Sequence, residues 1–198
     1  MNKLSKSALG IIVSILFFSG CAWQRIPTPP TSYVSKSVPI RVGIELGGTP
    51  ESQVYGTLVV KQLREIGVFE SVVYPYREGD SVDGILKLTI RGGWKGDTGA
   101  SLIKGAIIGL SLFTLSTVIG PEMTGTHDVN VTLSKDLTVV VDYSIQVKTS
   151  VSWGQAANTN EVAAKANDLQ VRKISVEIAN RIDNDRLRIL KEFGKKMN

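Results

Sequence analysis

Alternating apolar and polar positions predict a β-strand over residues 38–46, which ends at Gly47-Gly48. The next residues have the pattern of a helix start, with the Thr49 hydroxyl as N-cap and Pro50 in the first turn. Gly67 marks the end of this helix. The apolar residues between these ends fall on one helical stripe, namely Tyr55, Leu58, Val59, Leu63 and Ile66.

Further strands and one long helical region follow. The pattern predicts strands over residues 69–74, 86–90, 129–133 and 139–151, with a turn at Ser134-Lys135-Asp136 before the last one. A helical region capped by Thr159 extends to about Phe193. One face of the longest strand is expected to carry Val139, Val141, Tyr143, Ile145, Val147, Thr149 and Val151. Because the strand faces alternate, we predict an α+β fold, a two-layer sandwich with helices on one face of a mixed sheet of about five strands.

The first elements carry a recognisable motif. A strand RVGIEL is followed by a helix that ends in Leu63-x-x-x-Gly67-x-Phe69, and then by the strand Val82–Leu88 with the sequence VDGILKL. Over residues 38–91 this motif resembles the periplasmic domain of the curli secretion lipoprotein family and the N-terminal domain of the TolB family. The resemblance implies a periplasmic α+β domain over residues 38–198. Fold similarity does not assign a function.

The N-terminus has the three parts of a secretory signal. Lys3 and Lys6 form a positive region, residues 8–18 are apolar and uncharged, and Ser19-Gly20-Cys21 follows. The stretch 18–21 resembles the bacterial lipobox, which implies that residues 1–20 are a signal peptide and that Cys21 carries the lipid, palmitate included. Ala22 after the cysteine implies sorting to the outer membrane of a Gram-negative bacterium, on its periplasmic face.

The residues after the cysteine predict a tether. Residues 21–37 contain Pro27, Pro29 and Pro30 among small polar residues, which is typical of extended chain. Such a segment would let a lipid-anchored domain stand off the bilayer.

A long insert at residues 92–126 separates the third and fourth predicted strands. It starts with the glycine-rich stretch 92–99, expected to be a loop, and continues with the uncharged run 105–120. A membrane-spanning helix needs about 20 apolar residues, so this run is short for one. The alternatives are a buried hairpin or helix, or an exposed apolar patch that contacts a membrane or another subunit. In the last case the interaction residues would be Leu110, Leu112, Phe113 and Leu115.

Candidate chemistry is sparse. A chain of 198 residues with 42% hydrophobic and 21% charged residues has the composition of a globular protein. One Cys and one His exclude a disulfide framework and most metal sites, so we predict no metal site, no cofactor and no catalytic residues. His127 and Asp128 are adjacent on a predicted strand, and neighbouring strand residues point to opposite faces, which rules out a catalytic pair.

The charge of the chain adds little to the prediction of its function. Loss of Lys3 and Lys6 with the signal peptide lowers the formal net charge from +5 to +3. Residues 171–198 hold eight Lys or Arg against four acids, the pattern of a solvated helix face or of a surface that attracts anions. Nucleic acid is not expected as a partner of an exported protein.

Two hypotheses about function follow. The first is an outer-membrane-anchored periplasmic lipoprotein, not an enzyme, that acts as an assembly or interaction module of the cell envelope. Its partners would be the membrane, through acylated Cys21, and an envelope protein or further copies of itself. The alternative is a lipid- or glycan-binding lipoprotein that uses the apolar insert and the rings of Trp94 and Trp153.

Overall fold

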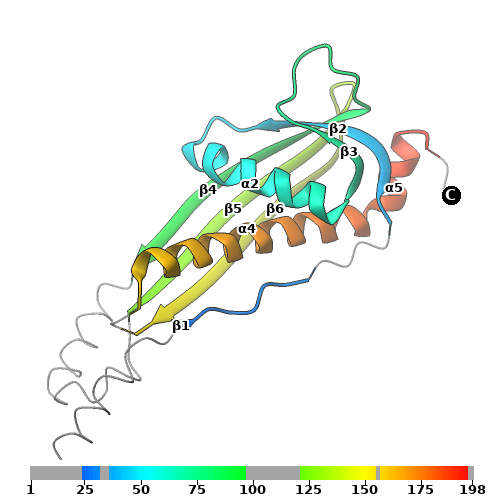
Figure 1. Ribbon diagram of the computed structural model, residues 1–198. Coiled ribbons are helices and arrows are strands. Elements are labelled where there is room, and N and C mark those ends of the chain that lie inside the picture. Colours follow the sequence, from blue (N-terminus) through cyan, green and yellow to red (C-terminus); the bar gives the residue numbers. More distant parts are fainter. Residues whose placement is uncertain (1–23, 32–35, 97–120, 155–156, 196–198) are drawn as a thin grey trace, which may run out of the picture. The chain divides into compact units, whose positions relative to one another are not determined.

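The computed structural model describes residues 24–31, 36–96, 121–154 and 157–195. These residues form an α+β fold with one mixed six-stranded sheet of order β1-β6-β5-β4-β2-β3 (Figure 1). The fold class is confirmed, with one strand more than predicted. The strands are β1 (Gln24–Arg25), β2 (Val38–Leu46), β3 (Phe69–Val73), β4 (Gly84–Gly96), β5 (Glu122–Lys135) and β6 (Thr138–Trp153), and the helices are α2 (Pro50–Ile66), α4 (Thr159–Asn184) and α5 (Arg186–Glu192).

The chain divides into two compact units. Among the described residues, unit 1 consists of 24–27, 94–96, 121–124, 149–154 and 157–167, and unit 2 contains the rest. Strands β4, β5 and β6 and helix α4 each contribute residues to both units.

In unit 2, strand β2 pairs in parallel with both of its neighbours. Val42 is in register with Val72 of β3 and with Gly84 of β4. Parallel strands need a crossover, and α2 supplies it between β2 and β3. At the start of α2 the Thr49 hydroxyl accepts a hydrogen bond from the backbone N–H of Ser52 at 3.2 Å, and Gly67 ends the helix with φ 73°, so both predicted caps are confirmed.

The buried stripe of α2 differs from the predicted one. It consists of Ser52, Gly56, Val59, Val60 and Leu63, whereas Leu58 is 46% exposed. The Ser52 hydroxyl accepts a hydrogen bond from the backbone N–H of Ile90 at 2.8 Å, which satisfies this buried polar group against β4. The stripe turned toward the sheet therefore includes small and polar residues that an apolar pattern does not identify.

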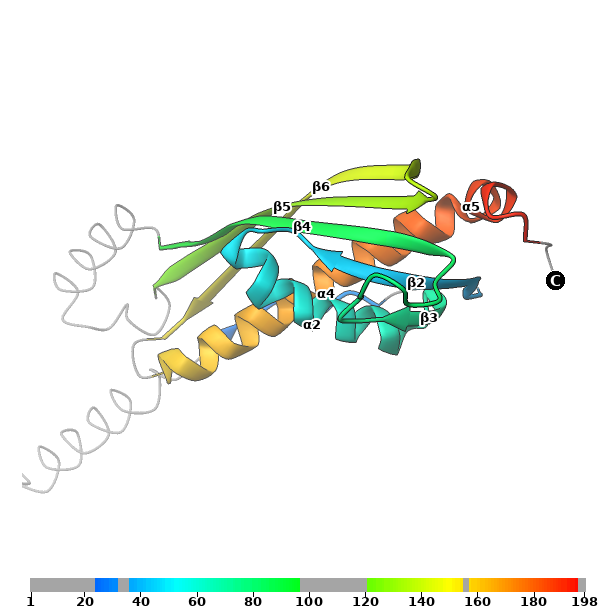
Figure 2. The same ribbon diagram turned by 90° about the horizontal axis from the view of Figure 1, so that it is seen from above.

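The core of unit 2 lies between the sheet and its helices. Within unit 2, Figure 2 shows α2 and the part of α4 from Asp168 onward on the same side of the strands. Alternate residues of β2, β4, β5 and β6 turn toward this core, where Ile44, Leu88 and Val131 pack with Ile178 of α4. Residues on the other face of the strands are exposed, among them Lys87, Arg91, Asp128, Asn130, Ser144 and Gln146.

The hairpin between β5 and β6 corrects two predictions. Its turn lies at Asp136 and Leu137, with φ of 47° and 67°, one residue further along the chain than predicted. Val139 is 56% exposed, while Val140 and Val141 are both buried, so the alternation of β6 begins only at Val141. The period-2 pattern fails beside the turn because the chain is still completing its reversal there.

The predicted insert is shorter than residues 92–126. Strand β4 continues to Gly96 and β5 begins at Glu122, so the first half of the glycine-rich stretch is strand and not loop. Residues 97–120, with the interaction residues predicted among them, lie outside the described residues, as does Cys21. Within the described chain, no helix combines the length and the apolar character required to span a bilayer.

The C-terminal helical region is two helices. α4 ends at Asn184 and α5 begins at Arg186, with Asp185 between them. The Tyr143 hydroxyl donates a hydrogen bond to the Asp185 carboxylate at 2.8 Å, and burial together with this bond raises the pKa of Tyr143. This contact ties the junction of the two helices to β6.

Candidate functional site

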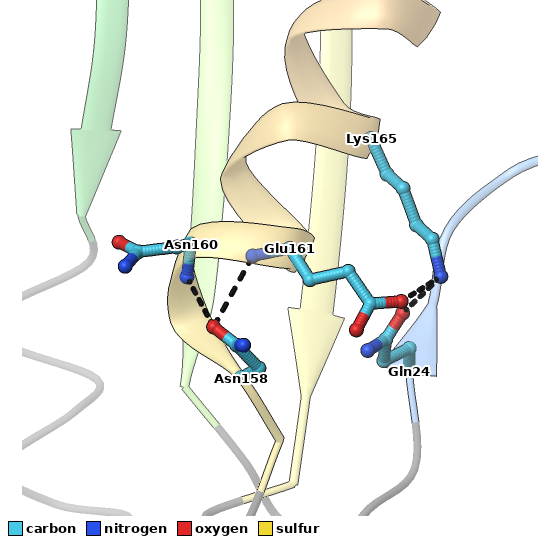
Figure 3. Close-up of polar contacts among 5 residues, drawn as sticks. All are labelled: Gln24, Asn158, Asn160, Glu161 and Lys165. Carbon is cyan, nitrogen blue, oxygen red and sulfur yellow. Dashed lines mark hydrogen bonds and ion pairs between the residues drawn. The ribbon is translucent and has the colours of Figure 1, made fainter.

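Gln24 and Arg25, the third and fourth residues after Cys21, are part of the folded protein. Gln24 and Arg25 form β1, which pairs antiparallel with the end of β6 in the register Gln24↔Trp153 and Arg25↔Ser152. The Lys165 ammonium of α4 donates to the Gln24 side chain at 3.1 Å and to the Glu161 carboxylate at 2.5 Å (Figure 3). The predicted tether over residues 21–37 is therefore interrupted by a fixed strand at its beginning.

Trp153 contacts two residues that are far apart in the sequence, Gln24 and Pro121. On one side it pairs with Gln24, three residues after Cys21. Its backbone N–H also donates a hydrogen bond to the carbonyl of Pro121 at 3.2 Å, one residue after the uncharged run ends. Trp153 thus contacts two described residues, Gln24 and Pro121, that lie close in the sequence to the predicted lipid anchor and to the predicted interaction run.

Around Trp153, unit 1 has a small apolar cluster of its own. Its buried members are Val151, Val162 and Ala166, and the half-buried residues Ile26, Trp94, Met123, Trp153 and Ala157 pack against them. The Trp94 indole N–H donates a hydrogen bond to the side-chain oxygen of Asn167 at 2.8 Å. Both tryptophans therefore contribute to the packing of unit 1 while their rings remain partly exposed.

The start of α4 supplies the polar side of the same unit. The side-chain oxygen of Asn158 accepts hydrogen bonds from the backbone N–H groups of Asn160 at 3.0 Å and Glu161 at 3.4 Å (Figure 3). Asn158 is thus the cap, and the prediction of Thr159 was one residue late, because Asn, Thr and Asn stand in a row here and all are suitable caps. Glu161 in the first turn is favourable beside the positive end of the helix dipole.

His127 is buried in unit 2 and has no catalytic partner among the described residues. Its ring stacks edge-on against Tyr55 with 4.8 Å between ring centroids, and neither ring nitrogen has a hydrogen-bond partner in the described part of the chain. Burial lowers the pKa of His127, an effect that the charges of Glu51 and Asp128 partly offset. Asp128 is exposed and accepts a hydrogen bond from Gln146 at 2.9 Å, so the two neighbours point to opposite faces, as predicted.

Three basic residues of the C-terminal region form ion pairs. Arg172 contacts Asp168 at 2.8 Å, and Arg181 contacts Glu177 at 3.0 Å. Lys195 lies 3.2 Å from Asp83, whose pKa is lowered, chiefly by a hydrogen bond from the backbone N–H of Arg41. These contacts favour the interpretation as a solvated helix face. In the parts of the chain that the structure describes, no three His, Cys, Asp or Glu residues are grouped so that they could hold a metal ion.

Sequence reasoning missed β1 and its contacts. A strand of two residues is too short to show alternation, and the prolines that follow indicated extended chain instead. The only available signal was Ile26, an isolated apolar residue in a polar segment, which packs into the cluster of unit 1.

Comparisons with known proteins give a fold likeness only. No protein-family model and no curated protein matches this chain. Similar solved structures include a minor lipoprotein from Acinetobacter baumannii, 11% identical with a TM-score of 0.46, which covers 74% of this chain and 94% of that one. Rare lipoprotein B from Shewanella oneidensis is 14% identical with a TM-score of 0.39 and covers 78% and 98%. Lipoprotein B from Nitrosomonas europaea is 11% identical with a TM-score of 0.41 and covers 79% and 92%. These neighbours are bacterial lipoproteins, and at TM-scores below 0.5 we carry no function over from them.

Proposed function

We propose that this chain is a lipid-anchored, non-catalytic interaction protein of the cell envelope in a Gram-negative bacterium. The observation that carries the proposal is the N-terminal sequence, in which a positive region, an apolar core and small residues precede the single cysteine, Cys21. Lipidation also converts that thiol to a thioether, which cannot form stray disulfides in an oxidising compartment. Two or three acyl chains, at about 0.8 kcal/mol per buried CH₂, hold a domain stably on a bilayer.

We infer the outer membrane and its periplasmic face from Ala22, because an aspartate at that position would favour the inner membrane. The described residues support a role without catalysis, since the one histidine is buried against Tyr55. Six charged residues of α4 form three ion pairs between positions four residues apart. An interaction role needs only a surface and a scaffold to present it.

The uncharged run is the proposed interaction segment. Its residues Leu110, Leu112, Phe113 and Leu115 would associate with an envelope protein or with a second copy of the chain. Burying one large apolar side chain contributes about 1.5–3 kcal/mol, so four of them would favour association strongly. The hydrogen bond from Trp153 to Pro121 supports this role, because it ties the end of the run to the unit that follows the anchor.

The experiment compares the wild type with Cys21→Ser in cells that are fed a fatty acid carrying a label. The wild type should take up the label and fractionate with the outer membrane. Cys21→Ser should take up none, because serine offers no thiol to which the lipid can be attached, and should remain as precursor or leave the membrane. Label on the Ser variant would contradict the proposal.

The same cells test the interaction segment when Leu112 and Phe113 are replaced by Ser. Crosslinking in intact cells should lose its main product in this double variant, while acylation and the melting temperature of the purified protein stay near the wild-type values. If the two residues instead belong to a core, each truncation should lower the free energy of unfolding by about 2–5 kcal/mol. Such a loss would contradict the interaction role and leave the anchor intact.

A further inference from the structure

The distance between the lipid and the folded protein is set by very few residues. Only Ala22 and Trp23 separate Cys21 from Gln24, the first residue of β1. Three residues of fully extended chain reach about 10 Å at roughly 3.3–3.6 Å each. A free tether over residues 21–37 would reach roughly 55 Å on the same basis. The pairing of β1 therefore decides whether the domain stands off the bilayer or is held close to it.

Several contacts hold β1 in place. Gln24 pairs with Trp153, and its side chain accepts a hydrogen bond from Lys165 at 3.1 Å. Ile26, directly after β1, packs into the apolar cluster of unit 1. Backbone pairing, a polar contact and apolar packing thus act together on three consecutive residues.

The residues beside this attachment point suit the interface of a bilayer. Trp94 and Trp153 are half-buried, and tryptophan is enriched where membrane meets water because its ring is apolar with one polar edge. Arg25 and Lys95 are exposed, and cations are attracted to the phosphates of anionic lipids. These residues belong to β1, β4 and β6, and all lie in unit 1. Both tryptophans pack against the apolar cluster, whereas Arg25 and Lys95 are the strand neighbours of residues on that side and point to the other face of the sheet.

We propose that this end of unit 1, a surface with Trp94 and Trp153 on one side of the strands and Arg25 and Lys95 on the other, lies against the bilayer that holds the lipid of Cys21, and that the short link before β1 keeps it there. The inference rests on the lipidation proposed above. The occupant is the bilayer and not a soluble partner, because a link of two residues leaves the surface no room to turn away from the membrane.

The test measures contact between the tryptophans and the lipid. The full chain is purified in its acylated form with Trp23→Phe, which leaves Trp94 and Trp153 as fluorophores, and is reconstituted into phosphatidylethanolamine–phosphatidylglycerol vesicles with brominated acyl chains. Bromine quenches tryptophan only at close range. Compared with vesicles of unbrominated lipid, the fluorescence should fall by about half.

Two insertions into the acylated chain that carries Trp23→Phe provide matched variants. Ten Gly and Ser residues placed directly before Gln24 lengthen the link that precedes β1, and most of the quenching should be lost. The same ten residues between Pro29 and Pro30, in the described exposed segment after β1, leave that link unchanged, and the quenching should remain. Equal quenching in the two variants would overturn the proposal.

A charge reversal tests the lipid chemistry. Arg25→Glu with Lys95→Glu should lower the quenching at least two-fold in vesicles that contain phosphatidylglycerol. The same change at Arg188 and Lys191 of unit 2 should leave it unchanged. The mass of the N-terminal peptide separates the two proposals: a missing acyl group contradicts the proposed function, whereas an acylated protein whose tryptophans are not quenched contradicts only this inference.

Discussion

His127 lies in an environment that differs strongly from that of a histidine in water. Both ring nitrogens are buried without partners among the described residues, and burial lowers the pKa below its ordinary value of 6.5. Above pH 6.5 the ring is neutral in the folded and in the unfolded chain, so its effect on stability is constant. Below pH 6.5 the unfolded chain takes up a proton that the folded protein does not, and stability falls until the pH reaches the folded pKa.

We predict that the free energy of unfolding falls between pH 7.5 and 5.0, by about 1.4 kcal/mol for each pH unit that separates the folded pKa of His127 from the unfolded one. His127→Leu should remove most of this pH-dependent fall. At pH 7.5 it should change the free energy of unfolding little, since no hydrogen bond to a described residue is lost. Urea unfolding at the two pH values measures both effects. The lowered pKa of Asp83 acts in a different window, because its contribution is lost only as the pH falls below 3.8. An unchanged pH dependence in the Leu variant would refute the assignment to His127.

At the scale of the element, Gly92 determines the course of β4. Its φ is 108°, and a Cβ added there would lie 2.2 Å from the carbonyl oxygen of Thr126 on β5. Only glycine adopts this conformation without strain, and the approaching atom is backbone that cannot move aside. Gly93, the next residue, has open space around its Cβ position.

We predict that Gly92→Ala lowers the free energy of unfolding by about 3 kcal/mol or more, the range of backbone strain combined with a clash. Gly93→Ala is the matched control and should change it by less than about 1 kcal/mol, with stabilisation favoured because alanine loses less entropy on folding. Thermal or urea unfolding of the two variants gives the answer. A similar loss of the free energy of unfolding in both variants would mean that the conformation of Gly92 does not determine the course of β4.

The same strand shows what the sequence could and could not predict. The alternation of Leu86, Leu88 and Ile90 predicted β4 correctly, because these residues face a core on one side only. The glycines that follow predicted a loop, yet Gly92 continues the strand, because a close backbone approach needs glycine as much as a turn does. Composition alone does not distinguish these two uses of glycine.

Tertiary context explains the remaining differences. Leu58 is exposed although it fits the helical stripe, since Gly56 and Ser52 provide the close contact with the sheet instead. β1 could not be predicted because its pairing partner, Trp153, is more than a hundred residues away in the sequence. Of the candidate site, the lipidation of Cys21 stays a prediction from local chemistry. That only two residues separate Cys21 from a paired strand follows from the long-range pairing alone.

At the scale of the whole molecule, the two units differ in the size of their cores. Unit 2 contains the main cluster, which includes Ile44, Leu88 and Ile178, while the cluster of unit 1 has only Val151, Val162 and Ala166 as fully buried members among the described residues. Stability within a protein follows such differences, and regions with few buried contacts open first. Helix α4 passes through both units, so its two parts report on them separately.

We therefore predict that, in native-state hydrogen exchange, residues 159–167 of α4 exchange at a lower free energy than residues 168–184. Ile178→Ala should lower protection in the second segment only, because unit 2 stays folded when unit 1 opens alone. Val162→Ala should lower protection in both by about 1.6 kcal/mol, from about 0.8 kcal/mol per buried CH₂, since unit 1 unfolds in either opening. An effect of Ile178→Ala on one segment and of Val162→Ala on both is expected only if unit 1 opens on its own. If Ile178→Ala lowered both segments equally, the described fold would open as one cooperative body.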